Sequence, residues 1–314
     1  MDGLQYIRKA SLKVVGKSGS GLDLSNLHFT FSIKKSDAQT PNAAVITIFN
    51  VAQDTALQIK KEFTRVIIQA GYEGLFGVIF DGNIRQSRIG RTSGTDTFVE
   101  ISAGDGDQAT ISAVVNTTIA ASQTTQANII AASTNSMQPY NVTVGYVAPT
   151  GNTKLPRGKS MFGMATDHLR RSAETIGATW SVQDGKFQMV PRTGVLPGEA
   201  VVLTPSTGLI GFPTQTDKGI SVRCLLNPQI RVAGLIKLDS RLVQEAQVAA
   251  DKKASASSST KAAATVDNHI ATDGIYRVLV TEYSGDTRGN DWYADLTCLA
   301  ADASAPAGEE VSAE

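Results

Sequence analysis

The side chains that most often bind metals or carry catalysis are few in this sequence and stand apart from one another. The histidines are His28, His168 and His269, and the cysteines are Cys224 and Cys298. No HExxH or CxxC spacing occurs among them, so the sequence lacks the usual patterns of a zinc or dithiol site. We therefore expect no histidine to act as a ligand or a base, and both cysteines to lie in the core.

Two Gly-Lys-Ser triplets resemble the end of the phosphate-binding loop GxxxxGK[ST]. The triplet at 16–18 would need a glycine where Ser11 stands, and the triplet at 158–160 would need one where Thr153 stands. The second triplet precedes a predicted helix, for which Ser160 is the expected N-cap. We interpret both triplets as turns.

Five acidic residues remain as candidates for chemistry, because glycosidases place two carboxylates across a cleft. They are Asp81, Glu100, Asp105, Asp107 and Glu282, and the sequence alone does not pair them. Asp105-Gly106-Asp107 resembles a fragment of a calcium loop, but the further ligands and the closing Glu are missing. Acidic residues in turns are more often turn formers. We predict that the chain is not an enzyme, with no catalytic, cofactor-binding or metal-binding residue and no cofactor.

The composition indicates a protein that packs against other subunits. Charged residues make up 18% of the 314 residues, below the roughly 25% typical of globular chains, and the cores of protein interfaces are depleted in charge. Lys plus Arg and Asp plus Glu number 29 each, without a basic stripe, so nucleic acid is not the expected main ligand.

The expected compartment is a reducing cytoplasm. The N-terminal 1–12 segment lacks the apolar run of a signal peptide, and no stretch reaches the ~20 apolar residues of a membrane helix. Two cysteines cannot build a disulfide framework. We therefore predict no membrane insertion.

Strands dominate the first hundred residues. Between Leu27 and Lys35 apolar and polar residues alternate strictly, as in a half-buried strand. A short helix is predicted over 54–63, with Asp54 as its N-cap. Strands separated by turn signals favour a barrel or a sandwich. Further strands are predicted over 43–49, 64–72, 77–87 and 97–103.

The middle third predicts a small α+β domain. Thr125 can cap a helix that runs to about Ser133, and a second, amphipathic helix should run from Ser160 to just before Gly177. A hairpin follows, in which Asp184-Gly185 joins two short apolar strands; this dipeptide is a strong hairpin signal.

Strands return from about residue 200. They are predicted around 220–226, 230–238, 274–284 and 292–300. The segment 249–265 has no large apolar residue and is predicted to be a mobile loop that trypsin cuts first. The acidic, small-residue-rich tail 301–314 is predicted to be flexible.

Three segments resemble baseplate hub proteins of contractile-tailed bacteriophages, the double-barrel hub family related to late control protein D. The stretch 203–240, LTPSTGLIGFPTQTDKGISVRCLLNPQIRVAGLIKLDS, is similar to the opening of the second barrel of such hubs, and 276–298, YRVLVTEYSGDTRGNDWYADLTC, to its closing strand pair. The block 162–190 is similar to their small intermediate domain. The N-terminal third matches less sharply, around Phe49 to Phe63.

The resemblance implies a mainly β chain with a small α+β middle domain and two tail-tube-like β-barrels. It further implies a homotrimeric ring that adapts the six-fold tail tube above to the three-fold piercing spike below. Expected partners are the spike protein, tail tube or tube-initiator proteins, the tape measure protein in the lumen and other baseplate proteins, with DNA only as passing cargo. The expected location is the virion, in the tail baseplate, after assembly in the host cytoplasm.

On this basis the predicted domains are a first barrel at 1–108, an intermediate domain at 109–198, a second barrel at 199–300 interrupted by the loop 249–265, and the tail. No lysozyme motif is present, and the sequence does not identify the residues of the oligomer interface. A tube initiator with one barrel per chain, a cell-wall hydrolase and a carbohydrate- or receptor-binding module remain alternatives.

Overall fold

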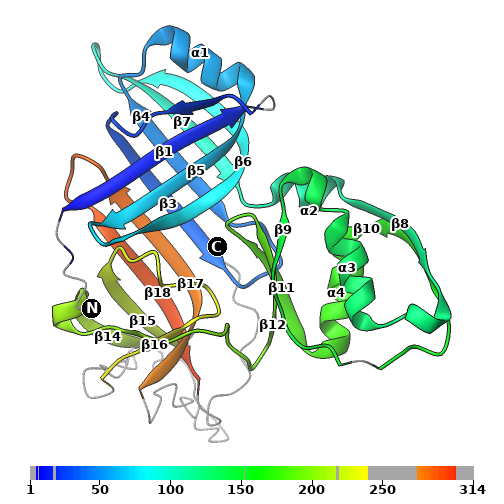
Figure 1. Ribbon diagram of the computed structural model, residues 1–314. Helices are drawn as coiled ribbons and strands as arrows, with labels where there is room; N and C mark the ends of the chain where they lie inside the picture. Colours follow the sequence, from blue (N-terminus) through cyan, green and yellow to red (C-terminus); the bar gives the residue numbers. More distant parts are fainter. Residues whose placement is uncertain are drawn as a thin grey trace, which may run out of the picture.

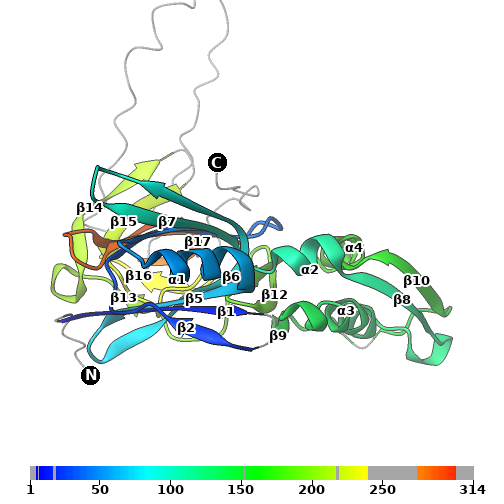
Figure 2. The same ribbon diagram turned by 90° about the horizontal axis from the view of Figure 1, so that it is seen from above.

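The computed structural model of the chain describes residues 5, 7–16, 19–151, 153–216, 219–239 and 274–301. It is a mainly β protein with a small α+β middle region, as predicted. Figure 1 shows two strand-rich regions, one above the other, with the middle region projecting from their side. Figure 2, seen from above, shows the same middle region extending away from the strands. The predicted loop 249–265 and the tail beyond Ala301 lie outside the described residues.

The first strand-rich region follows the predicted alternation of apolar and polar residues. Phe29, Phe31 and Ile33 are all buried on one face of their strand. The helix starts at residue 53, and its N-cap is Ala52 rather than the predicted Asp54, which instead lies in the first turn. There its charge faces the positive end of the helix dipole. The elements are β1 (Arg8–Gly16), β2 (Gly21–Asp23), β3 (Phe29–Ser36), β4 (Ala43–Phe49), α1 (Gln53–Glu62), β5 (Phe63–Tyr72), β6 (Leu75–Arg91) and β7 (Thr97–Gly104).

The second strand-rich region contradicts one of the predicted strands. The strand expected over 230–238 is reduced to Leu235–Lys237, because the residues before it form turns: Ile230 N–H donates to Asn227 O, and Ala233 has a left-handed φ of 63°. The elements are β13 (Val201–Val202), β14 (Leu209–Thr216), β15 (Gly219–Leu225), β16 (Leu235–Lys237), β17 (Ile275–Asp286) and β18 (Trp292–Ala300), with a 3-10 turn at Pro205–Thr207.

The two strand-rich regions share one sheet. β17 pairs antiparallel with β3, from Val280 opposite Ser36 to Asp286 opposite Thr30. The order is β14-β15-β18-β17-β3-β4-β7-β6-β5-β1-β2, with β16 also paired to β17 and β13 paired to β16. Buried apolar residues of both regions form one continuous cluster. The division into two barrel domains at the stated boundaries therefore stays a prediction.

The middle region has its own core, with Trp180 stacked on Phe187. Its elements are α2 (Asp107–Ser112), β8 (Val114–Ile119), α3 (Gln126–Asn135), β9 (Thr143–Val147), β10 (Lys159–Met164), α4 (Ala165–Ile176), β11 (Ala178–Gln183) and β12 (Lys186–Pro191), with 3-10 turns at Ala121–Gln123 and Gln138–Tyr140.

One of the two helix N-caps predicted in the middle region is correct and the other is wrong. Thr125 caps α3, its hydroxyl accepting from Asn128 N–H at 3.2 Å, and Gly177 ends α4 in the left-handed region at φ 63°. Ser160 is not an N-cap: it lies in β10 opposite Thr118, and α4 begins only at Ala165. Ser160 stays in a strand because β10 pairs with β8, which lies more than forty residues earlier in the sequence, although the residue type of Ser160 indicates a helix cap.

The predicted Asp-Gly hairpin is confirmed. Asp184 and Gly185 both have positive φ, 55° and 71°, as the central residues of a type I′ turn require. They join β11 and β12, in which Gln183 pairs with Lys186. The tip of this hairpin reaches the first strand-rich region, where it forms the contacts described below.

Candidate functional site

A buried carboxylate holds the tip of the hairpin. Asp105 follows the last residue of β7, is fully buried, and accepts hydrogen bonds from Asp184 N–H at 2.5 Å and Gly185 N–H at 2.9 Å. Burial raises the pKa of Asp105 to about 8, and the charge of Asp184 adds to this, whereas Lys35 and the two N–H groups act in the opposite direction. Asp105, which in the sequence resembles part of a calcium loop, thus anchors the tip of the hairpin.

A buried amide network extends this junction. Asn42 accepts from Ser36 N–H and donates to Val182 O and Gln183 Oε1, at 2.9–3.0 Å. Gln183 Nε2 in turn donates to Ser36 O at 2.7 Å. The contacts of Asn42 and Gln183 across this junction join the β3–β4 region to β11, so they orient the middle region against the first strand-rich region.

Ion pairs border the same junction. Lys35 donates to Asp184 Oδ1 at 2.5 Å, and Arg65 forms a bidentate pair with Asp81, both contacts at 2.6 Å. Bidentate Arg–carboxylate pairs are among the stronger polar contacts in proteins. The alternation of β3 places Lys35 on the apolar face with Ile33, and this was the one sequence signal for a buried lysine.

The buried Arg277 joins all three regions. It lies in β17, donates to Asp37 Oδ2 at 3.1 Å, and also donates to Arg192 O just after β12. Burial lowers the pKa of this guanidinium, partly offset by Asp37. In the sequence Arg277 stands in a mostly apolar run, and nothing there indicates that Asp37 is its ionic partner.

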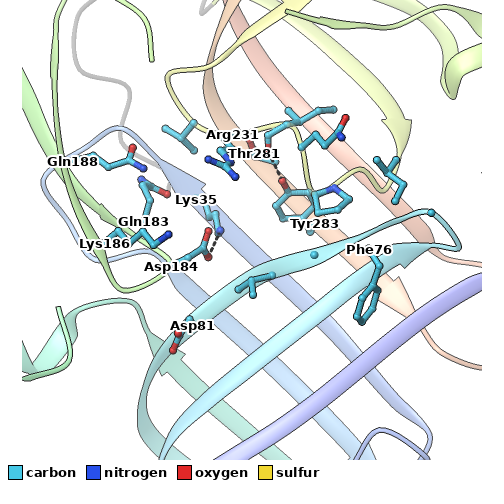
Figure 3. Close-up of a pocket in the computed structure, with 18 residues that line it drawn as sticks. Lys35, Phe76, Asp81, Gln183, Asp184, Lys186, Gln188, Arg231, Thr281 and Tyr283 are labelled. Atoms are coloured by element: carbon cyan, nitrogen blue, oxygen red, sulfur yellow. Dashed lines mark hydrogen bonds and ion pairs between the residues drawn. The ribbon is translucent and has the colours of Figure 1, made fainter. Parts of the chain in front are cut away.

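Between these contacts lies a pocket of about 490 Å³. Figure 3 shows β6 crossing one side, with Phe76 pointing away, while Lys35, Asp184 and Gln183 lie on another side and Arg231, Thr281 and Tyr283 on a third. A second cavity of about 400 Å³ shares Lys186, Gln188, Gln229 and Arg231 with it. The two cavities therefore adjoin along the hairpin strand β12.

Two residues of β17 form the floor of the pocket. Tyr283 donates its hydroxyl to Ile230 O at 2.8 Å, which holds the turns before β16 over the pocket, and burial raises the pKa of this phenol. Thr281 is fully buried, and its Oγ1 has no hydrogen-bond partner among the residues that the structure describes. An unpaired buried hydroxyl is costly, so this atom is unusual in a folded protein.

The other acidic candidates form ion pairs across neighbouring strands or with α2. Their partners are Arg88 for Glu100 at 3.0 Å, Arg85 for Asp107 at 2.7 Å and Lys34 for Glu282 at 3.1 Å. The structure does not place these carboxylates face to face in the pocket. Of the five acidic candidates, Asp81 alone lines it. Each described candidate has a role in pairing elements.

The histidines and cysteines are likewise separate. His28 Nε2 lies 2.8 Å from Asp286 Oδ1 and its ring stacks on Phe49, whereas His168 lies half-buried on α4 and His269 is outside the described residues. Cys224 and Cys298 are buried free thiols on the neighbouring strands β15 and β18. Among the described residues, no group of three His, Cys, Asp or Glu side chains could hold a metal ion. Nor is any described helix long and apolar enough to cross a membrane.

A family model described as baseplate hub gp41 matches residues 12–246, well over half of the chain. The chain belongs to the baseplate hub gp41 family. It is therefore a structural baseplate hub protein, a component of the phage tail, as the sequence resemblance predicted. Among curated proteins, none matches it significantly in sequence.

Solved structures of tail proteins share the fold of this hub. The 43 kDa tail protein of prophage MuSo2 from Shewanella oneidensis is 10% identical with a TM-score of 0.57, covering 96% of this chain and 100% of that chain. A tail protein from Neisseria meningitidis MC58 is also 10% identical, with a TM-score of 0.54 and coverage of 94% and 97%. At this identity the likeness concerns the fold alone.

A third similar structure comes from a secretion system. The c3393 protein of Escherichia coli, a type VI secretion component with structural similarity to the T4 bacteriophage tail proteins gp27 and gp5, is 9% identical with a TM-score of 0.52. The alignment covers 91% of the hub and 76% of that protein. The tail hub fold thus recurs at very low sequence identity.

Apolar side chains on the surface of the hub mark candidate contact regions. Phe212, on the end strand β14, is 60% exposed, and Phe162, on β10 of the middle region, is 78% exposed. Val114 lies on β8, the strand that pairs with β10, and is also exposed. The helix predicted from Ser160 places Phe162 on its apolar face, which is wrong, because Phe162 lies on β10 and α4 begins only at Ala165. Phe212 did not stand out in the sequence, because a strand pattern does not show which apolar side chains another element covers.

Proposed function

We propose that three copies of this hub form a ring at the centre of a contractile-tail baseplate, adapting the six-fold tail tube to the three-fold piercing spike. The observation that carries the proposal is the pair of strand-rich regions in each chain, joined edge to edge through β3 and β17. Three such chains would present six β regions around a lumen, which resolves the mismatch between the two symmetries.

The ends of the sheet support a closed ring. Among the described strands, β14 and β2 each pair on one side only, and unpaired sheet edges are surfaces that natural proteins cover or block. Contacts between different surfaces of identical chains close into rings when the rotation allows. The exposed Phe212 on β14 places an apolar side chain at one of these edges.

In this role the hub binds the spike protein below, tail tube or tube-initiator proteins above, the tape measure protein in the lumen and other baseplate proteins around it. DNA passes through the ring as cargo during genome ejection. The role is structural and not enzymatic, and assembly takes place in the host cytoplasm. The ion pairs and buried anchors of the acidic residues support this, because these groups are engaged in holding the fold.

Native mass spectrometry of the full chain, alone and co-expressed with its spike protein, tests the proposal. The expected species is a trimer, and a class average of the tail tip should show three chains with six β regions around an open lumen. A hexamer of chains would favour a tube initiator, and a monomer under both conditions would contradict the ring. Zymography on peptidoglycan tests the hydrolase alternative, for which a cleared band would be required.

A further inference from the structure

The first half of β6 has an open edge that faces the pocket. β7 pairs with β6 only from Asn83 onward, so positions 75–82 are paired with β5 on one side and with no described strand on the other. Tyr72 and Leu75 close a two-residue hairpin loop, and the pairing then alternates along the ladder. This alternation directs the N–H and C=O groups of Phe76 and Val78 away from β5, towards the pocket.

Two cations beside this edge have no ionic partner among the described residues. Lys186 and Arg231 border both cavities, and neither forms an ion pair with a described acid. The carboxylates of the same pocket are already neutralised, Asp184 by Lys35 and Asp81 by Arg65. Glu199 borders the second cavity and offsets some of the charge there. The pocket beside β6 therefore carries an excess of positive charge.

The floor of the pocket offers an unused hydrogen-bonding group. Thr281 lines the pocket, and its fully buried hydroxyl has no partner in the described part of the chain. Such a group costs folding free energy unless something pairs with it. Thr281 lines the pocket but is fully buried, so a ligand reaches this hydroxyl only by shifting the side chains that cover it.

We propose that the two adjoining cavities beside β6, called the groove below, bind an extended, acidic peptide segment of a partner protein. The segment would be added as a strand to the open edge of β6. The backbone of the segment would pair with Phe76 and Val78, its carboxylates would lie near Lys186 and Arg231, and one of its polar groups would pair with Thr281 Oγ1. Strand addition takes its affinity from main-chain hydrogen bonds and its specificity from flanking pockets.

The geometry favours a peptide over a small anion. The two cavities of about 490 and 400 Å³ adjoin and share four lining residues, so together they extend well beyond a single anion-sized site. A small anion would use the cations but would leave the strand edge unpaired. The inference is independent of the proposed ring, because every group in the groove belongs to one chain.

Fluorescence anisotropy with defined probes tests the inference on the full chain. The probe is a fluorescein-labelled (Glu-Val)4 peptide, and the matched control probe is (Lys-Val)4. We expect the acidic probe to bind with a Kd below about 1 mM and the basic probe to bind at least about tenfold more weakly. An acidic probe with N-methyl groups on its valines should lose binding, because it cannot complete the ladder.

Three variants assign the binding to this groove. Lys186→Glu with Arg231→Glu should weaken binding about tenfold or more, whereas Val78→Pro, which removes one outward N–H, and Thr281→Val should each weaken it about fivefold. The controls are Lys60→Glu with Lys61→Glu on α1, the same change of charge away from the groove, and Val78→Thr, which keeps the N–H. Both controls should bind as the unaltered chain does.

Several outcomes would overturn the inference. One is the absence of binding of the acidic probe at about 1 mM, and another is an equal loss in the α1 control. Equal binding of the N-methylated probe, or full displacement of the acidic probe by free glutamate at matched concentration, would show an anion site without strand addition. Circular dichroism and melting temperature of each variant confirm that a loss of binding is not a loss of fold.

Discussion

Asp105 makes the stability of the hub depend on pH. Burial raises its pKa from the ordinary value of 3.8 to about 8 in the folded chain. Between these values the folded chain holds a proton that the unfolded chain has released. The contribution of this group to the unfolding free energy is therefore largest below about pH 4 and is lost as the pH rises to about 8. The loss amounts to at most ~1.4 kcal/mol per pH unit.

The variant Asp105→Asn isolates this effect. Asparagine resembles the protonated acid and does not titrate. We therefore expect the difference in unfolding free energy, unaltered chain minus variant, to fall steadily between about pH 5 and 8. Urea denaturation at four pH values measures this difference, and all other titrating groups cancel in it. A difference that stays constant over this range would show that Asp105 is ionised throughout.

The two thiols should be inert in the native protein. Burial raises the pKa of Cys224 to about 12 and raises that of Cys298 as well, and the thiolate is the reactive form. We expect a thiol reagent to modify neither cysteine in the folded chain and both after denaturation without a reductant. Rapid modification of the native protein, or fewer than two thiols in denaturant, would contradict the buried, reduced state.

At the scale of elements, the β11–β12 hairpin connects the middle region to the first strand-rich region. Its turn depends on Gly185, which has a φ of 71° and donates its N–H to Asp105. Gly185→Ala should lower the unfolding free energy by about 1–2 kcal/mol, because a side chain is disfavoured in the left-handed region. Chemical denaturation measures the change.

The control for this substitution is Gly94→Ala. Gly94 has no heavy atom within 4 Å of an added Cβ and no left-handed φ, so this change should leave the unfolding free energy within about 0.5 kcal/mol. If both alanine variants lose the same stability, the loss at Gly185 does not come from its turn.

At the scale of the whole molecule, the end strand β14 is where the proposed ring should be most sensitive. Phe212 is 60% exposed there, so a charge at this position should cost little folding free energy but should disfavour an apolar subunit contact. We expect Phe212→Glu to shift the trimer towards monomers, with a dissociation constant raised about tenfold or more. Analytical ultracentrifugation over a range of concentrations measures the shift.

Phe162→Glu is the matched control, since Phe162 is also an exposed phenylalanine but lies on β10 of the projecting middle region. We expect this variant to form trimers as the unaltered chain does. If instead Phe162→Glu disrupts the trimer and Phe212→Glu does not, the subunit contact runs through the middle region and not through the sheet edge.

The sequence by itself determined the features that depend on neighbouring residues. The alternation from Leu27 to Lys35, the Asp184-Gly185 turn and the end of α4 at Gly177 were all predicted correctly, because side-chain periodicity and left-handed φ act within a few positions. The resemblance that indicated a hub also rests on such short contiguous stretches, and the family match agrees with it.

Only the tertiary structure decided which distant segments meet. Asp105 binds the backbone of Asp184, 79 residues later, and β3 pairs with β17 across most of the chain. Ser160 became a strand residue because β8 lies beside it, although its type favours a helix cap. The open edge of β6 exists because β7 is the shorter strand. Such pairings depend on the free energy of the whole packed arrangement, which no local pattern contains.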